Sequence, residues 1–386
     1  MHAAVILAAL PLALAAPSKR ATPAPLLKPR SGEIIEGKYI VKMKGSTGTE
    51  VLETHKNMVA SKVDYTYNSH KFAGFAASMT PEEVEALQQL PDVEYIEHDA
   101  VVTASAAVTQ NGADWGLARL SSTSAGGSTY TYDDSAGSGV CAYVVDTGID
   151  VTHPDFEGRA TFVDNEVDGD NTDGNGHGTH VAGTIGSATF GVAKKVSLYA
   201  VKVLGADGSG SNSGVIAGMD FVVSDAPSRN CPNGVVVNLS LGGGASSAVN
   251  QAAANVVSAG YFMAVAAGNS GADASTSSPA SEPSVCTAGA TDINDAFASY
   301  SNFGSLVDIL APGSNIQSTW PNGQTNTISG TSMASPHVAG LGAYFLGLRA
   351  SSAGNMCAYI QSVAQQGVIS GVPSGTTNAI VQNGEA

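Results

Sequence analysis

The sequence predicts an α/β protein, a mostly parallel sheet with helices on both faces, preceded by a small α+β domain. Two observations predict this order. From residue 114 onward, short apolar runs alternate with helical segments, as in sheets whose strands are joined by helices. Before residue 106 the pattern is mixed, and this part holds ten of the 17 Lys and Arg residues. At 386 residues, the chain is long enough for two or three domains of ~150 residues each.

The composition excludes several classes of protein. With 33 Asp and Glu residues, the net charge is −16, which would repel a nucleic-acid backbone. Only 13% of residues are charged and 43% are hydrophobic, which is unlike a disordered chain. No apolar run reaches the ~18 residues of a membrane-spanning helix. We therefore expect neither nucleic acid nor a membrane as a partner.

The first 16 residues have the pattern of a secretory signal peptide. Residues 3–16 are apolar but too few to span a bilayer, and Ala-Leu-Ala at 13–15 has the small-x-small form of a cleavage site. A secreted chain meets an oxidising compartment, and an even number of cysteines suits disulfides there. We expect two disulfides, for which three pairings are open, among Cys141, Cys231, Cys286 and Cys357.

Residues 17–105 are predicted to form a separate segment with a compact α+β domain over 38–102. The stretches 38–44 and 93–97 alternate between apolar and polar residues like strands. Between them, Thr80-Pro81-Glu82-Glu83 has the form of a capping box and predicts a helix that ends before Pro91. The polar stretch 103–113 is predicted to be an exposed linker.

The larger domain, 106–386, follows. Apolar runs predict buried parallel strands at 140–145, 196–203, 234–239, 262–267 and 306–310. Helices are predicted at 178–187, 213–224, 246–258 and 332–348. In such sheets, functional groups lie just beyond the carboxyl ends of the strands.

Polar residues stand at those strand ends and at the helix starts. Asp146 ends the strand at 140–145, where an Asp also suits a turn cap. His177 begins a helix after a Gly-rich stretch, and an imidazole that titrates near neutral pH suits a general base. Ser332 opens an apolar helix, where it suits an N-cap or a nucleophile. Asn269, after the strand at 262–267, suits a turn or an oxyanion donor.

Other functions use parts of this set. Asp-Thr-Gly at 146–148 is also the motif of pepsin-like aspartic proteases, but that chemistry needs two carboxylates and the motif occurs once. His177, His180 and His337 suggest a three-histidine zinc site, although no His-Glu-x-x-His motif is present. A catalytically silent binding protein with the same fold is a third alternative.

The chain order Asp, His, Asn, Ser resembles that of the subtilisin-like serine proteases, in particular the proteinase K-like fungal group. The motifs that carry the resemblance are Asp-Thr-Gly at 146–148, His-Gly-Thr-His at 177–180 and Gly-Thr-Ser-Met-Ala at 330–334. The resemblance covers nearly all of 106–386, and residues 38–102 look like the inhibitory propeptide of the family. It implies a secreted serine endopeptidase, made as a zymogen that cleaves itself near Ser105, with polypeptides and its own propeptide as partners and a monomeric state.

The resemblance also implies roles for single residues. Ser332 would be the nucleophile, His177 the general base, and Asp146 the group that orients the imidazole, with Asn269 in the oxyanion hole. Substrate would add as a strand to two chain edges and place an apolar or aromatic P1 side chain in a pocket of small residues. The edges are Gly208, Ser209 and Gly210 and also Ser240, Leu241 and Gly242, and the pocket is Ala266, Ala267 and Gly268.

The resemblance further implies two stabilising features. The disulfides would be Cys141–Cys231 and Cys286–Cys357. One calcium site would use the carbonyls of Pro283 and Val285 and the carboxylate of Asp308. A second calcium site of the group uses a carbonyl at the position of Thr123 and an acid, and the position of that acid holds Val368 here. One calcium site is therefore expected.

Overall fold

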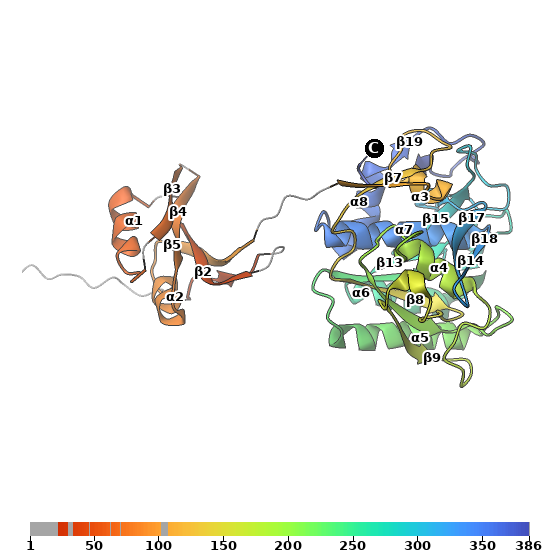
Figure 1. The fold of residues 1–386 in the computed structure, drawn as a ribbon, viewed down its shortest axis with the longest axis horizontal. Helices are drawn as coiled ribbons and strands as arrows, with labels where there is room; N and C mark the ends of the chain where they lie inside the picture. The colour runs from red at the N-terminus through yellow and green to blue at the C-terminus, as the bar shows by residue number, and fades with distance from the viewer. Residues whose placement is uncertain are drawn as a thin grey trace, which may run out of the picture. The chain divides into compact units, whose positions relative to one another are not determined.

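The computed structural model describes residues 22–29, 34–45, 47–61, 63–69, 71–101 and 107–385. The chain divides between residues 104 and 105 into two compact units, coloured from red to orange and from orange to blue in Figure 1. The predicted signal peptide at 1–16 and the predicted cleavage point near residue 105 lie outside the described residues. Within the described part, no helix is long and apolar enough to cross a bilayer.

The N-terminal unit combines helices with a sheet, as predicted. In its described part, the sheet has five strands, in the spatial order β1 (Leu26–Leu27), β5 (Val93–Ala100), β2 (Ile34–Met43), β4 (Phe72–Ser78) and β3 (Val63–Ser69). The helices are α1 (Thr49–Lys56) and α2 (Pro81–Gln88). The predicted capping box is confirmed, because Glu83 N–H donates to Thr80 Oγ1 at 3.3 Å and Thr80 N–H donates to Glu83 Oε2 at 2.8 Å.

The C-terminal unit is built on a mostly parallel sheet, as predicted. Within residues 107–385 this sheet has nine strands, and all neighbouring pairs are parallel except β19 and β20. In spatial order the strands are β19 (Gln365–Gln366), β20 (Ala379–Ile380), β16 (Ile309–Pro312), β15 (Cys286–Thr291), β13 (Phe262–Ala266), β11 (Gly234–Leu239), β8 (Val140–Asp146), β10 (Ser197–Lys202) and β9 (Ala160–Asn165).

Helices cover both faces of this sheet (Figure 1). They are α3 (Trp115–Arg119), α4 (His177–Gly186), α5 (Asn212–Asp225), α6 (Ser247–Ser258), α7 (Thr331–Gly347) and α8 (Met356–Val363). Alternate residues of β8 separate the two cores. Ala142 and Val144 belong to the core with α4 and α7, whereas Tyr143 and Val145 belong to the core with α5 and α6. The predicted helices match α4, α5, α6 and α7 within one residue at each end.

Smaller elements surround the sheet. Short pairs of strands are β6 (Ala107–Asn111) with β7 (Thr129–Asp133), β12 (Gly243–Gly244) with β14 (Ser277–Ser278), and β17 (Ile316–Trp320) with β18 (Gln324–Ile328). Single 3₁₀ turns are η1 (Pro154–Phe156), η2 (Ala226–Ser228), η3 (Ala274–Thr276) and η4 (Ala353–Asn355).

The sequence pattern missed four strands of the large sheet, β9, β15 and the two-residue strands β19 and β20. The sequence of β15 is Cys-Thr-Ala-Gly-Ala-Thr, and all six residues are buried. Its residues are too small to form the apolar run that predicts a buried strand. The strand predicted at 306–310 begins only at Ile309 in β16, and the carboxylate of Asp308, just before it, accepts a hydrogen bond from the amide of Thr287 at 2.8 Å.

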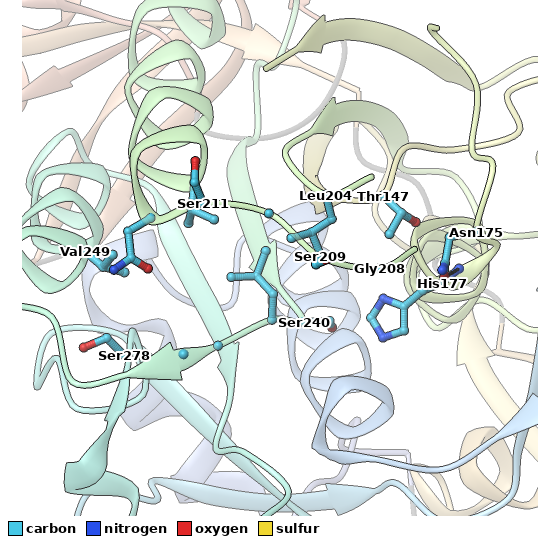
Figure 2. A pocket seen from close by; sticks show the side chains of 16 residues that line it. Thr147, Asn175, His177, Leu204, Gly208, Ser209, Ser211, Ser240, Val249 and Ser278 are labelled. Carbon is cyan, nitrogen blue, oxygen red and sulfur yellow. Dashed lines mark hydrogen bonds between the residues drawn. The ribbon is translucent and has the colours of Figure 1, made fainter. Parts of the chain in front are cut away.

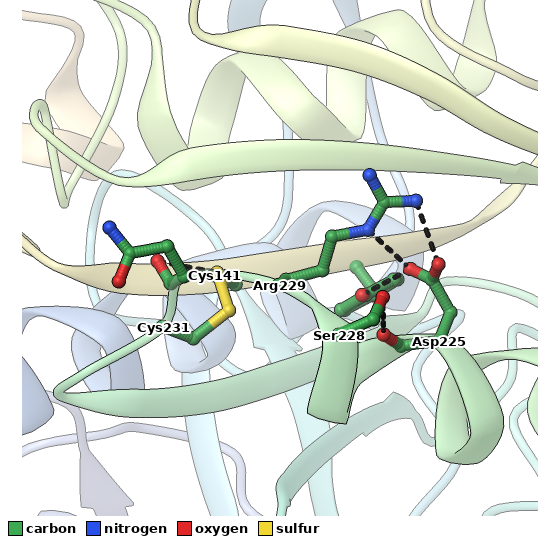
Figure 3. The surroundings of a disulfide bond; sticks show 7 residues. Cys141, Asp225, Ser228, Arg229 and Cys231 are labelled. Atoms are coloured by element: carbon green, nitrogen blue, oxygen red, sulfur yellow. Dashed lines mark hydrogen bonds and ion pairs between the residues drawn. A yellow bond between two sulfur atoms is a disulfide. The ribbon is translucent and has the colours of Figure 1, made fainter.

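Disulfides tie the sheet to its surroundings. The structure joins Cys141 to Cys231 and Cys286 to Cys357, which is the pairing that the resemblance implies. Beside the first disulfide, the guanidinium of Arg229 donates two hydrogen bonds to the Asp225 carboxylate, at 2.8 and 2.7 Å (Figure 3). The bridges span 90 and 71 residues. By the chain-entropy model, each stabilises the fold by about 4.5 kcal/mol.

Candidate active site

The end of β8 meets the start of α4 at Asp146 and His177. Asp146 is fully buried, and its Oδ1 accepts hydrogen bonds from His177 Nδ1 and from the amide of Thr147, both at 2.7 Å. The His177 side chain keeps a quarter of its surface exposed. The bond to Asp146 therefore fixes the imidazole and leaves Nε2 for other partners.

Glycines let the chain carry His177 close to β8. Gly176 precedes the helix with φ of 104°, and a Cβ there would lie 2.4 Å from the Trp320 ring. Gly178 faces the carbonyl of Gly148, which a Cβ would approach to 2.1 Å. A larger residue at 176 would collide with Trp320, and one at 178 would push α4 away from the end of β8 at Asp146.

The charge around His177 favours its protonated form. Burial opposes protonation, but the Coulomb attraction and the hydrogen bond of Asp146, together with the charge of Asp173, outweigh it. These contributions raise the pKa of His177 above the ordinary value of 6.5. The imidazole is thus suited to take up a proton and hold it.

Ser332 lies in the first turn of α7 and is bonded to Ser240, just beyond β11. Ser332 Oγ donates to the Ser240 carbonyl at 3.0 Å, and Ser240 Oγ donates to the Ser332 carbonyl at 2.7 Å. Ser240 and His177 line the same pocket. Through its bonds to Ser240, Ser332 therefore adjoins the pocket that His177 lines.

Asn269 faces the same helix start from the end of β13. Its Oδ1 accepts hydrogen bonds from the amide of Thr331 at 2.8 Å and from Thr331 Oγ1 at 2.9 Å. Because both partners are donors, the carbonyl oxygen must face Thr331. The amide NH₂ is then directed away from Thr331, and Asn269 lines a pocket together with Ser332.

Two adjoining pockets follow this edge of the sheet. The first, of about 410 Å³, has His177, Asn175 and Thr147 at one end and Val249 and Ser278 at the other (Figure 2). It contains all six residues predicted for the substrate-binding edges: Gly208, Ser209, Gly210, Ser240, Leu241 and Gly242.

The second pocket, of about 360 Å³, shares Leu241 and Gly242 with the first and includes Ser332 and Asn269. Of the predicted P1 residues, Ala266 and Gly268 line it. Ala267 is fully buried, does not line the pocket, and donates its amide to the Ala288 carbonyl. None of the described residues that line this pocket carries a charged side chain.

Asp173 was not singled out from the sequence, although it organises this site. Its Oδ1 accepts hydrogen bonds from Thr147 Oγ1 at 2.8 Å and from the amides of Asn175 and Gly176. Its Oδ2 accepts from the amide and the hydroxyl of Thr179. The buried carboxylate therefore joins the turn after Asp146 to the first turn of α4. Its position four residues before His177 was the available signal, but an acid in an acidic loop looks like a surface residue.

The three-histidine zinc alternative is wrong. The ring of His180 bonds the Ile316 carbonyl and the ring of His337 bonds the Met333 carbonyl, so the two rings have different partners. Among the described residues, the group of possible metal-ligating side chains that converges contains none of these histidines; it is Cys286, Asp308 and Cys357.

Asp308 has the character of a cation ligand. The two cysteines near it are joined to each other, which leaves the carboxylate as the hard donor. Burial raises the pKa of Asp308 to about 6, against the lowering effect of the Thr287 amide. In the described part of the chain, no basic side chain forms an ion pair with it. A carboxylate of this kind fits the oxygen ligands that calcium prefers, and it accepts from the amide of Thr287, which follows Pro283 and Val285 closely in the chain.

At the position of the second family calcium site, the carbonyl expected to bind calcium is hydrogen-bonded to a side chain of the protein. The carbonyl of Thr123 accepts a hydrogen bond from Gln365 Nε2 at 3.0 Å. Val368, at the position of the acid, is 39% exposed.

Comparison with protein families gives two matches. Residues 137–369 match the subtilase family of peptidases, and residues 38–105 match the peptidase inhibitor I9 family. The second range coincides with most of the N-terminal unit.

Individual proteins agree with these matches. The chain is 53% identical to a cuticle-degrading protease of Metarhizium anisopliae, with all of both chains covered. It is 66% identical to proteinase T of Parengyodontium album over 76% of this chain and 99% of that protein. The crystal structure of a cold-adapted subtilisin-like serine proteinase is 43% identical, with a TM-score of 0.67, and covers 71% of this chain and 99% of its own. The chain therefore belongs to the subtilase family of serine proteases, with an inhibitor-type domain before its protease domain.

Proposed function

We propose that the chain is a secreted endopeptidase that cleaves peptide bonds through an acyl-enzyme at Ser332. The observation that carries this proposal is the 2.7 Å hydrogen bond between His177 and Asp146. His177 lines the same pocket as Ser240, which is hydrogen-bonded to Ser332. A fixed imidazole next to a serine at a helix start is the arrangement that activates a hydroxyl.

In this mechanism, Ser332 Oγ attacks the carbonyl carbon of the scissile bond while His177 Nε2 takes the hydroxyl proton. Asp146 keeps the imidazole in the required tautomer and stabilises its charged form. The Ser332 N–H and the Asn269 amide donate to the oxyanion. His177 then gives the proton to the leaving amine, and water releases the acyl group by the same steps in reverse.

The pocket chemistry supports an apolar or aromatic P1 residue. Ala266 and Gly268 leave room beside Ser332, and the lining offers no charge to pair with Lys, Arg, Asp or Glu. A panel of chromogenic peptides that differ only at P1 tests this. We expect Phe, Leu and Ala to be cleaved faster than Lys or Asp, whereas a preference for a charged P1 residue would contradict the proposal.

We propose that residues 1–16 are a signal peptide, that 17–105 are a propeptide, and that 106–386 are the mature enzyme. The inhibitor-family match at 38–105 and the division of the chain after residue 104 support this order. The propeptide would inhibit the enzyme and assist its folding, because sheets with long-range contacts fold slowly. N-terminal sequencing of the mature protein tests the boundary.

The pKa of His177 sets the acid limit of activity. The imidazole must be neutral to accept the Ser332 proton, so kcat/KM should rise with pH through a midpoint above 6.5. Asp146→Asn removes the charge that raises this pKa and should therefore move it to lower pH. NMR titration of His177 in the inactive Ser332→Ala background measures both values. An unchanged pKa in the Asp146→Asn protein would contradict the proposed pairing.

We propose one calcium site at Asp308, with the carbonyls of Pro283 and Val285. Calcium bound only to the folded state would stabilise it by about 2.7 kcal/mol at 100 times its Kd. We expect a chelator to lower the melting temperature of the wild-type protein and to have little effect on Asp308→Asn. Asp134→Asn, at an exposed ion pair with Lys195, is the control and should respond like the wild type. An equal response of all three proteins would contradict the site.

A further inference from the structure

A buried amide interrupts the most apolar part of β11. The strand has the sequence Gly-Val-Val-Val-Asn-Leu, and Asn238 is fully buried in it. A buried amide without partners would cost about 1–3 kcal/mol. Asn238 has a partner on each side, because its Nδ2 donates to Ser240 Oγ at 2.9 Å and its Oδ1 accepts from Ser335 Oγ at 2.8 Å.

These bonds close a ring between β11 and the first turn of α7. Ser240 Oγ donates a hydrogen bond to the Ser332 carbonyl at 2.7 Å, and Ser335 lies three residues after Ser332 on the helix. A serine hydroxyl has a single proton to donate. The amide of Asn238 therefore sets the direction of these hydrogen bonds. Ser240 Oγ accepts from Asn238, so its own proton is free to donate to the Ser332 carbonyl.

Pro336 explains why the Ser332 carbonyl needs this donor. In an α-helix, the carbonyl of residue 332 accepts from the N–H of residue 336. Pro336 lies inside α7 and has no N–H to give. Ser240 Oγ supplies the hydrogen bond that the helix lacks at this point.

We propose that Asn238 is a positioning residue for the nucleophile. Acting through Ser240 and Ser335, it holds the Ser332 carbonyl and so fixes the peptide that follows the reactive serine. The peptide between Gly330 and Thr331 is held separately, by the bond from the Thr331 amide to Asn269. With both flanks fixed, Oγ can rotate towards His177 while the main chain of Ser332 stays in place. This inference rests on the proposed role of Ser332.

The first test replaces Asn238 with leucine, which has a similar shape but no hydrogen-bonding group. The variants are made as full-length chains and, where needed, matured with a trace of wild-type enzyme. We expect Asn238→Leu to lower kcat by about tenfold or more, because small misplacements of reacting groups cost that much, while KM stays within about twofold. Tyr130→Phe is the control, because it removes one buried hydrogen bond, from Tyr130 Oη to the Val192 carbonyl, outside both pockets. It should leave kcat unchanged.

The second test restores the missing helical donor. Pro336→Ala supplies an N–H for the Ser332 carbonyl, so the ring becomes less important. In that background, Asn238→Leu should lower kcat by only about threefold or less, a coupling that a double-mutant cycle measures. An equal loss in both backgrounds would overturn the proposal, because it would mean that Asn238 acts on something other than this carbonyl.

Two further variants keep the proposal testable if the leucine protein does not fold. Ser335→Ala removes only the hydroxyl that orients the amide and should lower kcat by a few-fold without a change in KM. In Asn238→Asp, the ionised carboxylate accepts the hydrogen bond of the Ser240 hydroxyl, which then no longer donates to the Ser332 carbonyl. The neutral acid, in contrast, can donate to Ser240 as the amide does. Burial raises the pKa of such an acid. Its kcat relative to wild type should therefore rise as the pH falls, and a constant ratio would contradict the proposal.

The outcome separates this inference from the function on which it rests. Labelling of the wild-type protein by a serine-reactive phosphonate reports on Ser332 itself. If the wild type is labelled at Ser332 and folded Asn238→Leu reacts at the same rate, the positioning role is wrong and the proposed function stands. If the wild type is not labelled there, the proposed function is wrong and the positioning role falls with it.

Discussion

Replacing Ser332 with alanine is expected to lower kcat by about 10⁶-fold, the size of the effect when the nucleophile of subtilisin is removed. The reason is that the acyl-enzyme forms on the Ser332 hydroxyl, whereas the neighbouring hydroxyl at the start of α7, Thr331 Oγ1, already donates to Asn269 and accepts from the Gly268 amide. A peptide substrate with a chromogenic leaving group measures the loss. The full-length chain should also stay uncut near residue 105, because the proposed processing needs the same serine.

The fold should survive this change. The hydroxyl of Ser332 donates one hydrogen bond, to the Ser240 carbonyl, so its loss should cost only about 1 kcal/mol of stability. Ser329→Ala is the matched control three residues earlier, where the hydroxyl is exposed and accepts from the Asn315 amide. It should keep full activity. Residual hydrolysis by Ser332→Ala within tenfold of the wild-type rate would contradict the nucleophile assignment.

Replacing Asn269 with leucine is expected to lower kcat by about 10²–10³-fold with little change in KM, as when one oxyanion donor is removed from subtilisin. The amide is directed to the oxyanion only because Thr331 holds its carbonyl oxygen with two donors. The ground-state carbonyl of the substrate gains little from this donor, so the loss should fall on kcat. Steady-state kinetics with one peptide substrate separate the two constants.

Asn233→Leu is the control for this variant. Asn233 donates its amide to the Ser138 carbonyl at 2.8 Å and lies outside both pockets. The Asn233→Leu variant removes a side-chain amide of the same size outside the site, so kcat should not change. A rise in KM with unchanged kcat in Asn269→Leu would show that the residue binds substrate and does not stabilise the oxyanion.

The sequence predicted the parts of the fold that apolar pattern and capping determine. Buried strands such as β8 and β11 contain runs of Val, and the helices α4, α5, α6 and α7 begin after Gly or Ser. It failed for β15, whose small residues are buried by the packing of α7 against the sheet and not by their own hydrophobicity. Tertiary contact decided that element, and no local pattern reports it.

The site was predictable as far as short motifs reach. Asp146, His177 and Asn269 stand beside residues that mark them, at strand ends and in Gly-rich turns. Asp173 and Asn238 carry no such mark, because their roles come from hydrogen bonds to residues distant in the sequence. The resemblance implies Ala267 for the P1 pocket together with Ala266 and Gly268, but its side chain is fully buried and does not line the pocket, which no short motif reports.

The most direct test of the whole account is to label the mature protein with a serine-reactive phosphonate and to locate the adduct by mass spectrometry. Ser332 is predicted to carry the adduct, one per molecule, with complete loss of peptidase activity. Loss of activity with the adduct on a different serine, or full activity after Ser332 has been modified, would contradict the proposed mechanism.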